Sequence, residues 1–260
     1  IGSDVRRTLM PFLQNIIKMP PGINLQARSS GTLKGIAADV KICTAWGDLK
    51  ATGMATRRKG DIEIEANLTS EKVDLEKFLE VSMLGPIDLS VDAKGRIGKD
   101  PDIEMNGLIS SIELLDQPIQ AIKLNGTFEK TNVNATLSVE DPKYQSQIHS
   151  EISFSGPLLI TNAVQLNNFS LGSLLDMDSS LSVSGELKSE IKLDQPSIEG
   201  YVKGNRVLFK SQSVEYLLDT MSLHALISPE ASEINYYSDY EQGDLLSNFD
   251  IRDLREVIQT

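Results

Sequence analysis

Alternation of apolar and polar residues constrains the fold of this chain more than any other feature. Residues 36–44 (IAADVKICT) and 61–70 (DIEIEANLTS) place an apolar side chain at almost every second position, and the pattern recurs from residue 23 onward. Successive side chains of a β-strand point to opposite faces, so a period of two predicts strands with one dry and one wet face. No helical segments of the length that parallel crossovers need lie between these strands. The sequence therefore predicts an all-β fold with a mainly antiparallel sheet.

Composition and charge narrow the classes of function. The 260 residues suffice for one large β-domain, and 40% of them are apolar while only 5% are aromatic. The formal net charge of −12 repels a phosphate backbone, so we expect no nucleic-acid partner. Cys43 is the single cysteine and forms no intrachain disulfide. No apolar run approaches the roughly 20 residues that span a bilayer, and we expect the chain to be part of a longer protein whose targeting or anchoring segment lies outside it.

Residues 1–22 predict an amphipathic helix that caps the sheet. Apolar residues follow helical spacing up to Ile17, Ser3 is a candidate N-cap, and MPPG (residues 19–22) ends the helix. Pro11 predicts a kink or an earlier break. A helix of this kind could also lie on a membrane surface, but it carries few cations, and we expect it to cap the end of the sheet.

Two segments break the strand pattern in the same way and mark the ends of repeats. Residues 72–86 and 163–178 each leave a strand through a short helix-like bridge, and residues 249–258 begin the same pattern. The strands that follow the first two bridges lead to Pro-x-Ile-Glu motifs that begin at Pro101 and Pro196, 95 residues apart. This spacing predicts stacked β-repeats of about ninety residues. The predicted organisation is an N-terminal helix or cap (1–22), a partial repeat (23–72), two full repeats (73–163 and 164–248) and the start of another (249–260).

Glycines recur on the apolar side of these strands, as at Gly53, Gly95 and Gly185. Glycine weakens a strand and marks either a bend or a close approach. One explanation is that glycines let a long antiparallel sheet curve. The other is that they leave open space in an apolar trough along the sheet. Two facing sheets would need bulky residues to fill the space between them, whereas these strands use many small ones. We therefore expect an elongated, curled sheet, a β-taco or repeating β-groove, with short helical bridges between repeats.

The order of motifs in the first full repeat resembles a repeat of the TamB and AsmA-like proteins. It runs from VDLEKFL (73–79) through LGPIDLSVDAKGRIG (84–98) to PDIEMNGLISSIELLDQPIQ (101–120). The second repeat, from residue 164, follows the same order, and GTLKG (31–35) is similar to the Gly-x-Leu-x-Gly pairs of that family. The resemblance covers almost all of the chain beyond its predicted N-terminal helix.

The resemblance implies a location and a function. Members of this family join an inner-membrane anchor to a long periplasmic β-structure, taco-like in cross-section, with an apolar groove along its length. They are implicated in moving phospholipid between the two membranes of diderm bacteria and, for TamB with its outer-membrane partner of the Omp85 class, in assembling outer-membrane proteins. By resemblance we expect a periplasmic segment with phospholipid or another acyl-chain ligand, no cofactor and no catalytic residue. An Omp85-class partner would bind through regions outside this chain.

The groove would be lined by apolar residues that share one strand register. Each acyl CH₂ sheltered from water contributes about 0.8 kcal/mol, so a continuous apolar trough offers an acyl chain a path along the sheet. Ordinary core packing is the alternative for each residue, and a structural or adhesive β-repeat with a dry interior is the alternative for the whole chain. The predicted groove residues are Leu89, Val91, Ala93, Ile103, Met105, Ile109, Leu137, Ile152, Phe154, Leu181, Val183, Leu187, Ile198 and Val202.

The sequence offers few candidates for catalysis or metal binding. His149 and His224 are the only histidines, and neither has a cysteine or carboxylate at ligand spacing beside it. Asp176 and Asp178 resemble a carboxylate pair for a divalent cation, but they fall where a turn is expected. Near the end of the chain, one face of a last strand that runs into a polar loop is predicted to carry Ile234, Tyr236, Ser238 and Tyr240. The alternative is an aromatic and acidic cluster that binds a partner or an ion. We therefore expect neither a metal site nor an enzyme.

Overall fold

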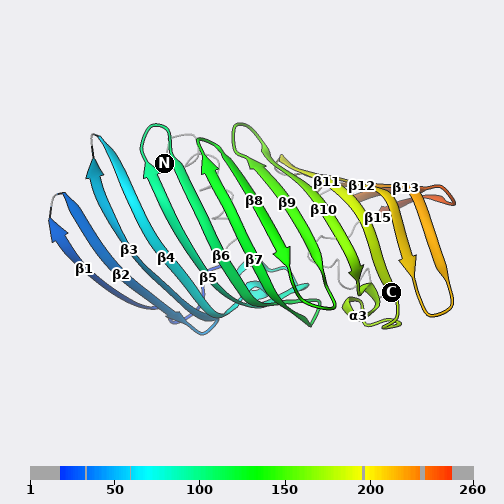
Figure 1. The fold of residues 1–260 in the computed structure, drawn as a ribbon, viewed down its shortest axis with the longest axis horizontal. Coiled ribbons are helices and arrows are strands. Elements are labelled where there is room, and N and C mark those ends of the chain that lie inside the picture. The colour runs from blue at the N-terminus through cyan, green and yellow to red at the C-terminus, as the bar shows by residue number, and fades with distance from the viewer. Residues whose placement is uncertain (1–17, 33, 59, 195–196, 229–231, 248–260) are drawn as a thin grey trace. The chain divides into compact units, whose positions relative to one another are not determined.

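The chain folds into antiparallel β-structure. The computed structural model describes residues 18–32, 34–58, 60–194, 197–228 and 232–247. The described residues form fifteen strands in one sheet, and every strand lies beside its neighbours in sequence, from β1 to β15. Figure 1 shows β1 to β7 in this order. The strand pairs with a defined register are all antiparallel. This arrangement confirms the predicted all-β, mainly antiparallel fold.

The chain divides into two compact units, Ile1–Thr136 and Leu137–Thr260, and one strand, β8, spans the division. The first unit contains β1 (Asn24–Thr32), β2 (Gly35–Thr44), β3 (Gly47–Arg58), β4 (Asp61–Asp74), α2 (Leu75–Leu79), β5 (Leu84–Ile97), β6 (Asp102–Leu114), β7 (Gln117–Glu129) and the start of β8 (Asn132–Val139). The second unit contains β9 (Ser146–Ser153), β10 (Leu158–Phe169), α3 (Leu171–Leu174), β11 (Ser182–Asp194), β12 (Ser197–Lys210), β13 (Glu215–Ile227), β14 (Ser232–Ser238) and β15 (Gln242–Ser247).

The predicted N-terminal helix lies almost wholly outside the described residues. The described part begins at Lys18, whose main-chain N–H donates to the Phe78 carbonyl of α2 at 2.8 Å. The Lys18 ammonium also lies 3.3 Å from the Glu80 carboxylate, and Pro20 is buried. The third predicted bridge, residues 249–258, falls outside the description as well. None of the described helices has the length and apolarity that crossing a membrane requires.

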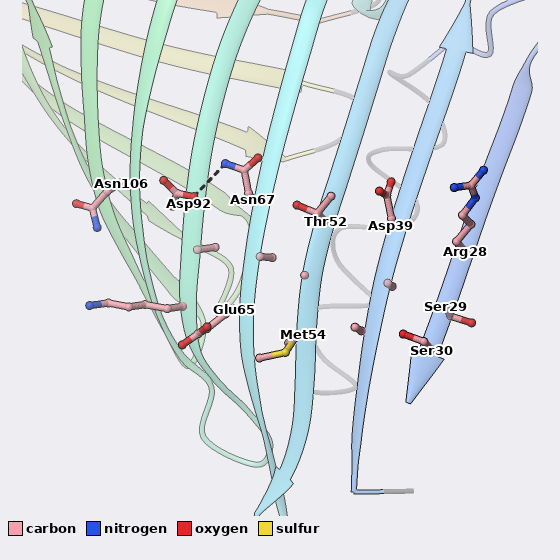
Figure 2. A pocket seen from close by; sticks show the side chains of 16 residues that line it. Arg28, Ser29, Ser30, Asp39, Thr52, Met54, Glu65, Asn67, Asp92 and Asn106 are labelled. Carbon is pink, nitrogen blue, oxygen red and sulfur yellow. Dashed lines mark hydrogen bonds between the residues drawn. The ribbon is translucent and has the colours of Figure 1, made fainter. Parts of the chain in front are cut away.

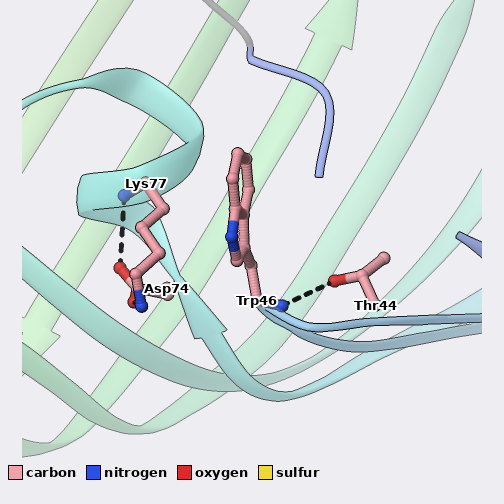
Figure 3. Close-up of polar contacts among 4 residues, drawn as sticks. All are labelled: Thr44, Trp46, Asp74 and Lys77. Carbon is pink, nitrogen blue, oxygen red and sulfur yellow. Dashed lines mark hydrogen bonds and ion pairs between the residues drawn. The ribbon is translucent and has the colours of Figure 1, made fainter. Parts of the chain in front are cut away.

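In the first unit the chain leaves β4 through a β-bulge that a neighbouring side chain closes. Lys72 has a positive φ of 49°, and the register between β4 and β5 shifts there. The Asp88 carboxylate on β5 accepts a hydrogen bond from the Lys72 N–H at 2.6 Å, which satisfies a donor that the bulge removes from the ladder. Asp74 then caps α2, because its carboxylate accepts from the Lys77 N–H at 3.2 Å (Figure 3).

The second unit repeats this bulge and its closure. Asn168, 96 residues after Lys72, has a φ of 50°. The Ser184 hydroxyl on β11 accepts from the Asn168 N–H at 2.8 Å. Ser170 is the N-cap residue of the short helix α3 that follows. The repeat is therefore 96 residues long at this point, slightly longer than the sequence pattern predicts.

A hairpin loop binds the start of each bridging helix. The Asp74 N–H donates to the Trp46 carbonyl in the loop between β2 and β3, at 2.8 Å. The Ser170 N–H donates to the Lys143 carbonyl in the loop between β8 and β9, also at 2.8 Å. In both units, the loop that binds the helix comes directly before the two strands that lead into that helix. Six strands, β3 to β8, separate the first of these loops from the second.

Aromatic rings pack at both bridges. The Trp46 indole meets Phe78 edge-on, with ring centroids 5.3 Å apart, and Figure 3 shows the Trp46 ring beside α2. In the second unit Tyr144 packs on Phe169 with ring centroids 5.4 Å apart, and only 2% of Tyr144 is exposed. Burial, with a contribution from the Asp141 carboxylate, raises the pKa of Tyr144. Each bridge is therefore fixed by backbone hydrogen bonds and by an aromatic contact.

In each unit a pair of buried residues lies beside the bridge. Val73 and Ile87 face each other across β4 and β5 and are 6% and 8% exposed. Phe169 and Val183 are the corresponding pair across β10 and β11, and Val183 is 5% exposed. The predicted repeat boundary at Val164 lies within β10, so Phe169 is the structural counterpart of Val73. Away from the bridges most apolar residues of the strands are only half-buried.

Candidate apolar binding face

One side of the strands carries the predicted groove residues of the first unit. Residues paired in register across antiparallel strands point to the same side of a sheet. By this criterion the six candidates of the first unit share one side, which we call the apolar face. They are Leu89, Val91 and Ala93 of β5 and Ile103, Met105 and Ile109 of β6.

In the second unit, four candidates share one side of the strands, and we apply the same name to it. They are Ile152, Leu187, Ile198 and Val202. The other four lie elsewhere: Phe154 follows the end of β9, Leu181 precedes the start of β11, Val183 faces Phe169 at the bridge, and Leu137 lies in β8.

Exposure separates the fourteen candidates into two groups. Twelve of them are half-buried, so part of each side chain is open to solvent. Phe154 and Val183 are 9% and 5% exposed and belong to the packed core. The structure therefore places Val183 at the bridge and not on an open surface.

The apolar face extends beyond the residues that the sequence analysis selected. Leu68 pairs in register with Val91 and is 41% exposed, and Ile36 of β2 belongs to the same side and is 53% exposed. The predicted groove residues all belong to the two full repeats, and none of them lies in β2 to β4. The signal was present, because the same alternation runs through residues 36–44 and 61–70.

Two equivalent glycines on the apolar face let a neighbouring side chain lie over the strand. Gly107 of β6 pairs with Val91, and Gly204 of β12 pairs with Leu187. A Cβ at Gly107 would lie 2.8 Å from Val91 Cγ2, and one at Gly204 would lie 3.0 Å from Leu187 Cδ2. Side chains of neighbours thus fill the space above these glycines. Glycine is favoured at position 95 for a different reason, because its φ of 155° is one that L side chains rarely adopt.

The centre of the apolar face in the first unit is lined by very small residues. The register joins Gly53 of β3, Ala66 of β4 and Ala93 of β5. We call these three residues the small-residue row. The row presents only methyl groups and backbone, so it offers no side-chain hydrogen bond to a ligand.

The corresponding positions of the second unit form a polar ladder, which we define as Ser150 of β9, Asn162 of β10 and Ser189 of β11. The three residues are paired in register. Ser150 Oγ donates to Asn162 Oδ1 at 2.6 Å, and Asn162 Nδ2 donates to Ser189 Oγ at 2.9 Å. They follow the members of the small-residue row by 97, 96 and 96 residues, which places the ladder and the row at the same point of the repeat.

The opposite, polar face of the first unit has a hollow that the sequence analysis did not predict. Its volume is about 860 Å³, and Figure 2 shows polar side chains from β1 to β6 along it. Within it Asn67 Nδ2 donates to Asp92 Oδ1 at 2.9 Å. No group of three His, Cys, Asp or Glu side chains in the described ranges is placed to hold a metal ion. The longest polar row along the hollow is formed by Arg28, Asp39, Thr52, Asn67, Asp92 and Asn106.

The other residues that the sequence singled out lie apart from one another. His149 lies in β9, and His224 Nε2 of β13 is 3.2 Å from Glu199 Oε1 on the exposed polar side. Asp178 accepts hydrogen bonds from the N–H and hydroxyl of Ser180, at 3.0 and 2.8 Å, and these bonds lower the pKa of Asp178. This carboxylate therefore closes a turn, as its position in the sequence indicates.

The tyrosines near residue 237 divide between strand and loop. Tyr236 lies in β14, where it pairs in register with Leu223 on the apolar face. Tyr237 points to the other side and is 53% exposed. Tyr240 lies beyond the end of β14 and is 70% exposed.

Comparisons of the chain with models of protein families, with curated proteins and with solved structures return no match.

Proposed function

We propose that the chain is a periplasmic segment of a TamB/AsmA-like bridge protein, whose apolar face carries phospholipid between the inner and outer membranes. The supporting observation is the series of half-buried apolar residues that continues from strand to strand within each unit. In the full protein, the segment would be anchored at the inner membrane. The bridge would also support assembly of outer-membrane proteins, with an Omp85-class partner that binds outside this chain.

Half-buried apolar side chains in register favour a ligand with long acyl chains. Removing hydrocarbon from water contributes about 25 cal/mol for each Å² buried, and contiguous apolar patches mark binding surfaces on proteins. Val91 illustrates the geometry, because its register neighbours are Leu68 on one side and Gly107 on the other. An acyl chain laid along this row would shelter both itself and the side chains.

Ion pairs between strand residues of the first unit lie on the polar face. Lys94 and Glu104 pair at 3.1 Å, and Lys41 and Asp48 pair at 3.4 Å, all at strand positions that alternate with those of the apolar face. Such exposed pairs contribute little to stability. Their placement keeps the apolar face suited to hydrocarbon and leaves a charged headgroup in solvent.

A structural or adhesive β-repeat with a dry interior is the competing function. Phe154 and Val183 favour it locally, because both are packed against the protein itself. For the chain as a whole, that function requires the twelve half-buried candidates to be covered by other protein. It also predicts that the purified protein binds no lipid.

The test is native mass spectrometry of the purified protein, followed by lipid extraction and titration with a fluorescent diacyl phospholipid. Leu89→Asp places a carboxylate on the apolar face. Leu108→Asp makes the same change on the neighbouring strand but on the polar face, at a position that is 45% exposed, and is the matched control. Because a charge beside hydrocarbon is costly, we expect Leu89→Asp to weaken uptake about tenfold or more and Leu108→Asp to change it less than about twofold.

Three outcomes decide between the functions. Phospholipid that co-purifies with the protein and is lost in Leu89→Asp, with an unchanged circular dichroism spectrum, supports the lipid-carrying face. Lipid-free protein that takes up no fluorescent phospholipid contradicts it and favours the structural repeat. Equal uptake by folded Leu89→Asp and Leu108→Asp also contradicts it.

A further inference from the structure

The polar ladder stands between two aliphatic rows of the apolar face in the second unit. Three polar side chains in such surroundings are costly unless they are hydrogen-bonded. The two bonds within the ladder meet part of that cost. The row on one side consists of Ile152, Ile160 and Ile191, and the row on the other consists of Ile148, Val164 and Leu187.

The ladder uses only part of its hydrogen-bonding capacity. Asn162 accepts from Ser150 and donates one of its two amide protons to Ser189. The Ser189 hydroxyl accepts that bond, and its own proton takes part in no bond between described residues. The second amide proton of Asn162 is likewise unused among them. The ladder therefore presents hydrogen-bond donors to a ligand that lies over the face.

The surroundings of the ladder select a neutral acceptor. Across β9, β10 and β11, the register-paired rows on either side of it carry no charged side chain among the described residues. A desolvated phosphate or carboxylate would need a charged partner there. An ester carbonyl is neutral, accepts hydrogen bonds and donates none. In a diacyl lipid it is also attached directly to the acyl chain that the aliphatic rows would shelter.

We propose that the polar ladder binds the ester carbonyl groups of an acyl lipid whose chains lie on the flanking aliphatic rows. This inference rests on the proposed lipid function and specifies the polar group that the face recognises. It also fixes a position, at the centre of β9 to β11. The small-residue row of the first unit has no side-chain donor, so the second unit holds the ester group more firmly than the first.

The experiment compares two fluorescent phosphatidylcholines that differ only in their linkages, a diester and its diether analogue. We expect the wild-type protein to bind the diester about threefold to tenfold more tightly, the range that one or two hydrogen bonds to a carbonyl supply. Ser189→Ala removes the hydroxyl donor and leaves the bond between Ser150 and Asn162 intact, so it should reduce the preference without unfolding the protein. The triple variant Ser150→Ala, Asn162→Ala, Ser189→Ala also removes the amide donors and should abolish it. Thr161→Ala, the next position of β10 and on the opposite face, is the control that should keep the preference.

The outcomes separate this inference from the function on which it rests. Equal binding of diester and diether by the wild-type protein overturns the ester site and leaves the lipid-carrying face in place. A preference that persists in both Ser189→Ala and the triple variant Ser150→Ala, Asn162→Ala, Ser189→Ala also overturns it. Binding of neither probe overturns the ester site together with the lipid function. A preference that is weaker in Ser189→Ala and lost in the triple variant, with unchanged circular dichroism and retained diether binding, supports the site.

Discussion

The two units share a bridge but differ at the centre of the apolar face. Both close a β-bulge with a side chain from the next strand, and both have a polar N-cap residue before a short helix. At equivalent positions of the face, the first unit has the small-residue row and the second has the polar ladder. The bridge thus fixes where the strands begin and how they pair, while the polarity of the face varies independently of it.

The largest expected effect is a difference in stability between a substitution at the bridge and the same substitution on the apolar face. Val183→Asp buries a carboxylate opposite Phe169 and should lower the free energy of unfolding by about 3–5 kcal/mol. Val91→Asp introduces the same group on the half-buried face and should cost about 1 kcal/mol or less. Urea unfolding followed by circular dichroism measures both. Equal losses of stability would show that the two positions are packed alike.

The next effect concerns the centre of the face. Asn162→Ala leaves the hydroxyls of Ser150 and Ser189 without their partner and should cost about 1–3 kcal/mol. Replacing all three by alanine should cost less than the sum of the single changes, because it removes the ladder completely. Ala66→Asn in the first unit is the reciprocal control, since no partner side chain stands beside it. Urea unfolding measures the loss of stability in each variant. If the loss in the triple variant equals the sum of the three single losses, coupling within the ladder is contradicted.

A smaller difference in stability is expected between variants that remove the side-chain acceptor at each of the two β-bulges. Asp88→Ala removes a carboxylate that accepts from the Lys72 N–H and should cost about 1–2 kcal/mol. Ser184→Ala removes a neutral acceptor at the equivalent place and should cost about 0.5–1.5 kcal/mol. Thermal unfolding checks the order of the two variants. Asp102→Ala, which loses an exposed ion pair, is the control and should change stability less than either.

The smallest effect depends on pH and belongs to the second unit. The Asp239 carboxylate accepts from the N–H and the hydroxyl of Thr220, at 2.9 and 2.7 Å, and these bonds lower the pKa of Asp239. Their contribution to stability is therefore complete above the ordinary aspartate pKa of about 3.9 and is lost as the pH falls through the lower folded value. Thr220→Val should return the pKa of Asp239 toward its usual range. Carboxyl carbon NMR titration measures it, and an unchanged value would contradict this cause.

The strands and their class were predictable because the signal is local. Alternation in residues 61–70 is visible without any knowledge of partners, and β4 spans Asp61–Asp74. The segments predicted as bridges, 72–86 and 163–178, contain α2 and α3. The alignment of the repeats was not predictable to the residue. It depends on the bulges, which depend in turn on side chains one strand away that differ between the units.

The apolar face was predictable in part for the same reason. The register of β5 and β6 brings their candidates to one side, as alternation indicates. The burial of Val183 was not predictable, because it results from packing at the bridge opposite Phe169. The polar ladder could not be recognised either, since its members lie 12 and 27 residues apart and meet only through the pairing of three strands.

The order of the sheet has a consequence for how the chain acquires its structure during synthesis. Because every strand pairs with the strands next to it in sequence, no early strand must wait for a distant one. Each hairpin can add to those already formed as the chain emerges from the ribosome, without rearranging them. The growing edge at any moment is the most recently completed strand, and it becomes the template for the next one. Growth from one end in this way suits a protein that is extended by copying its repeat.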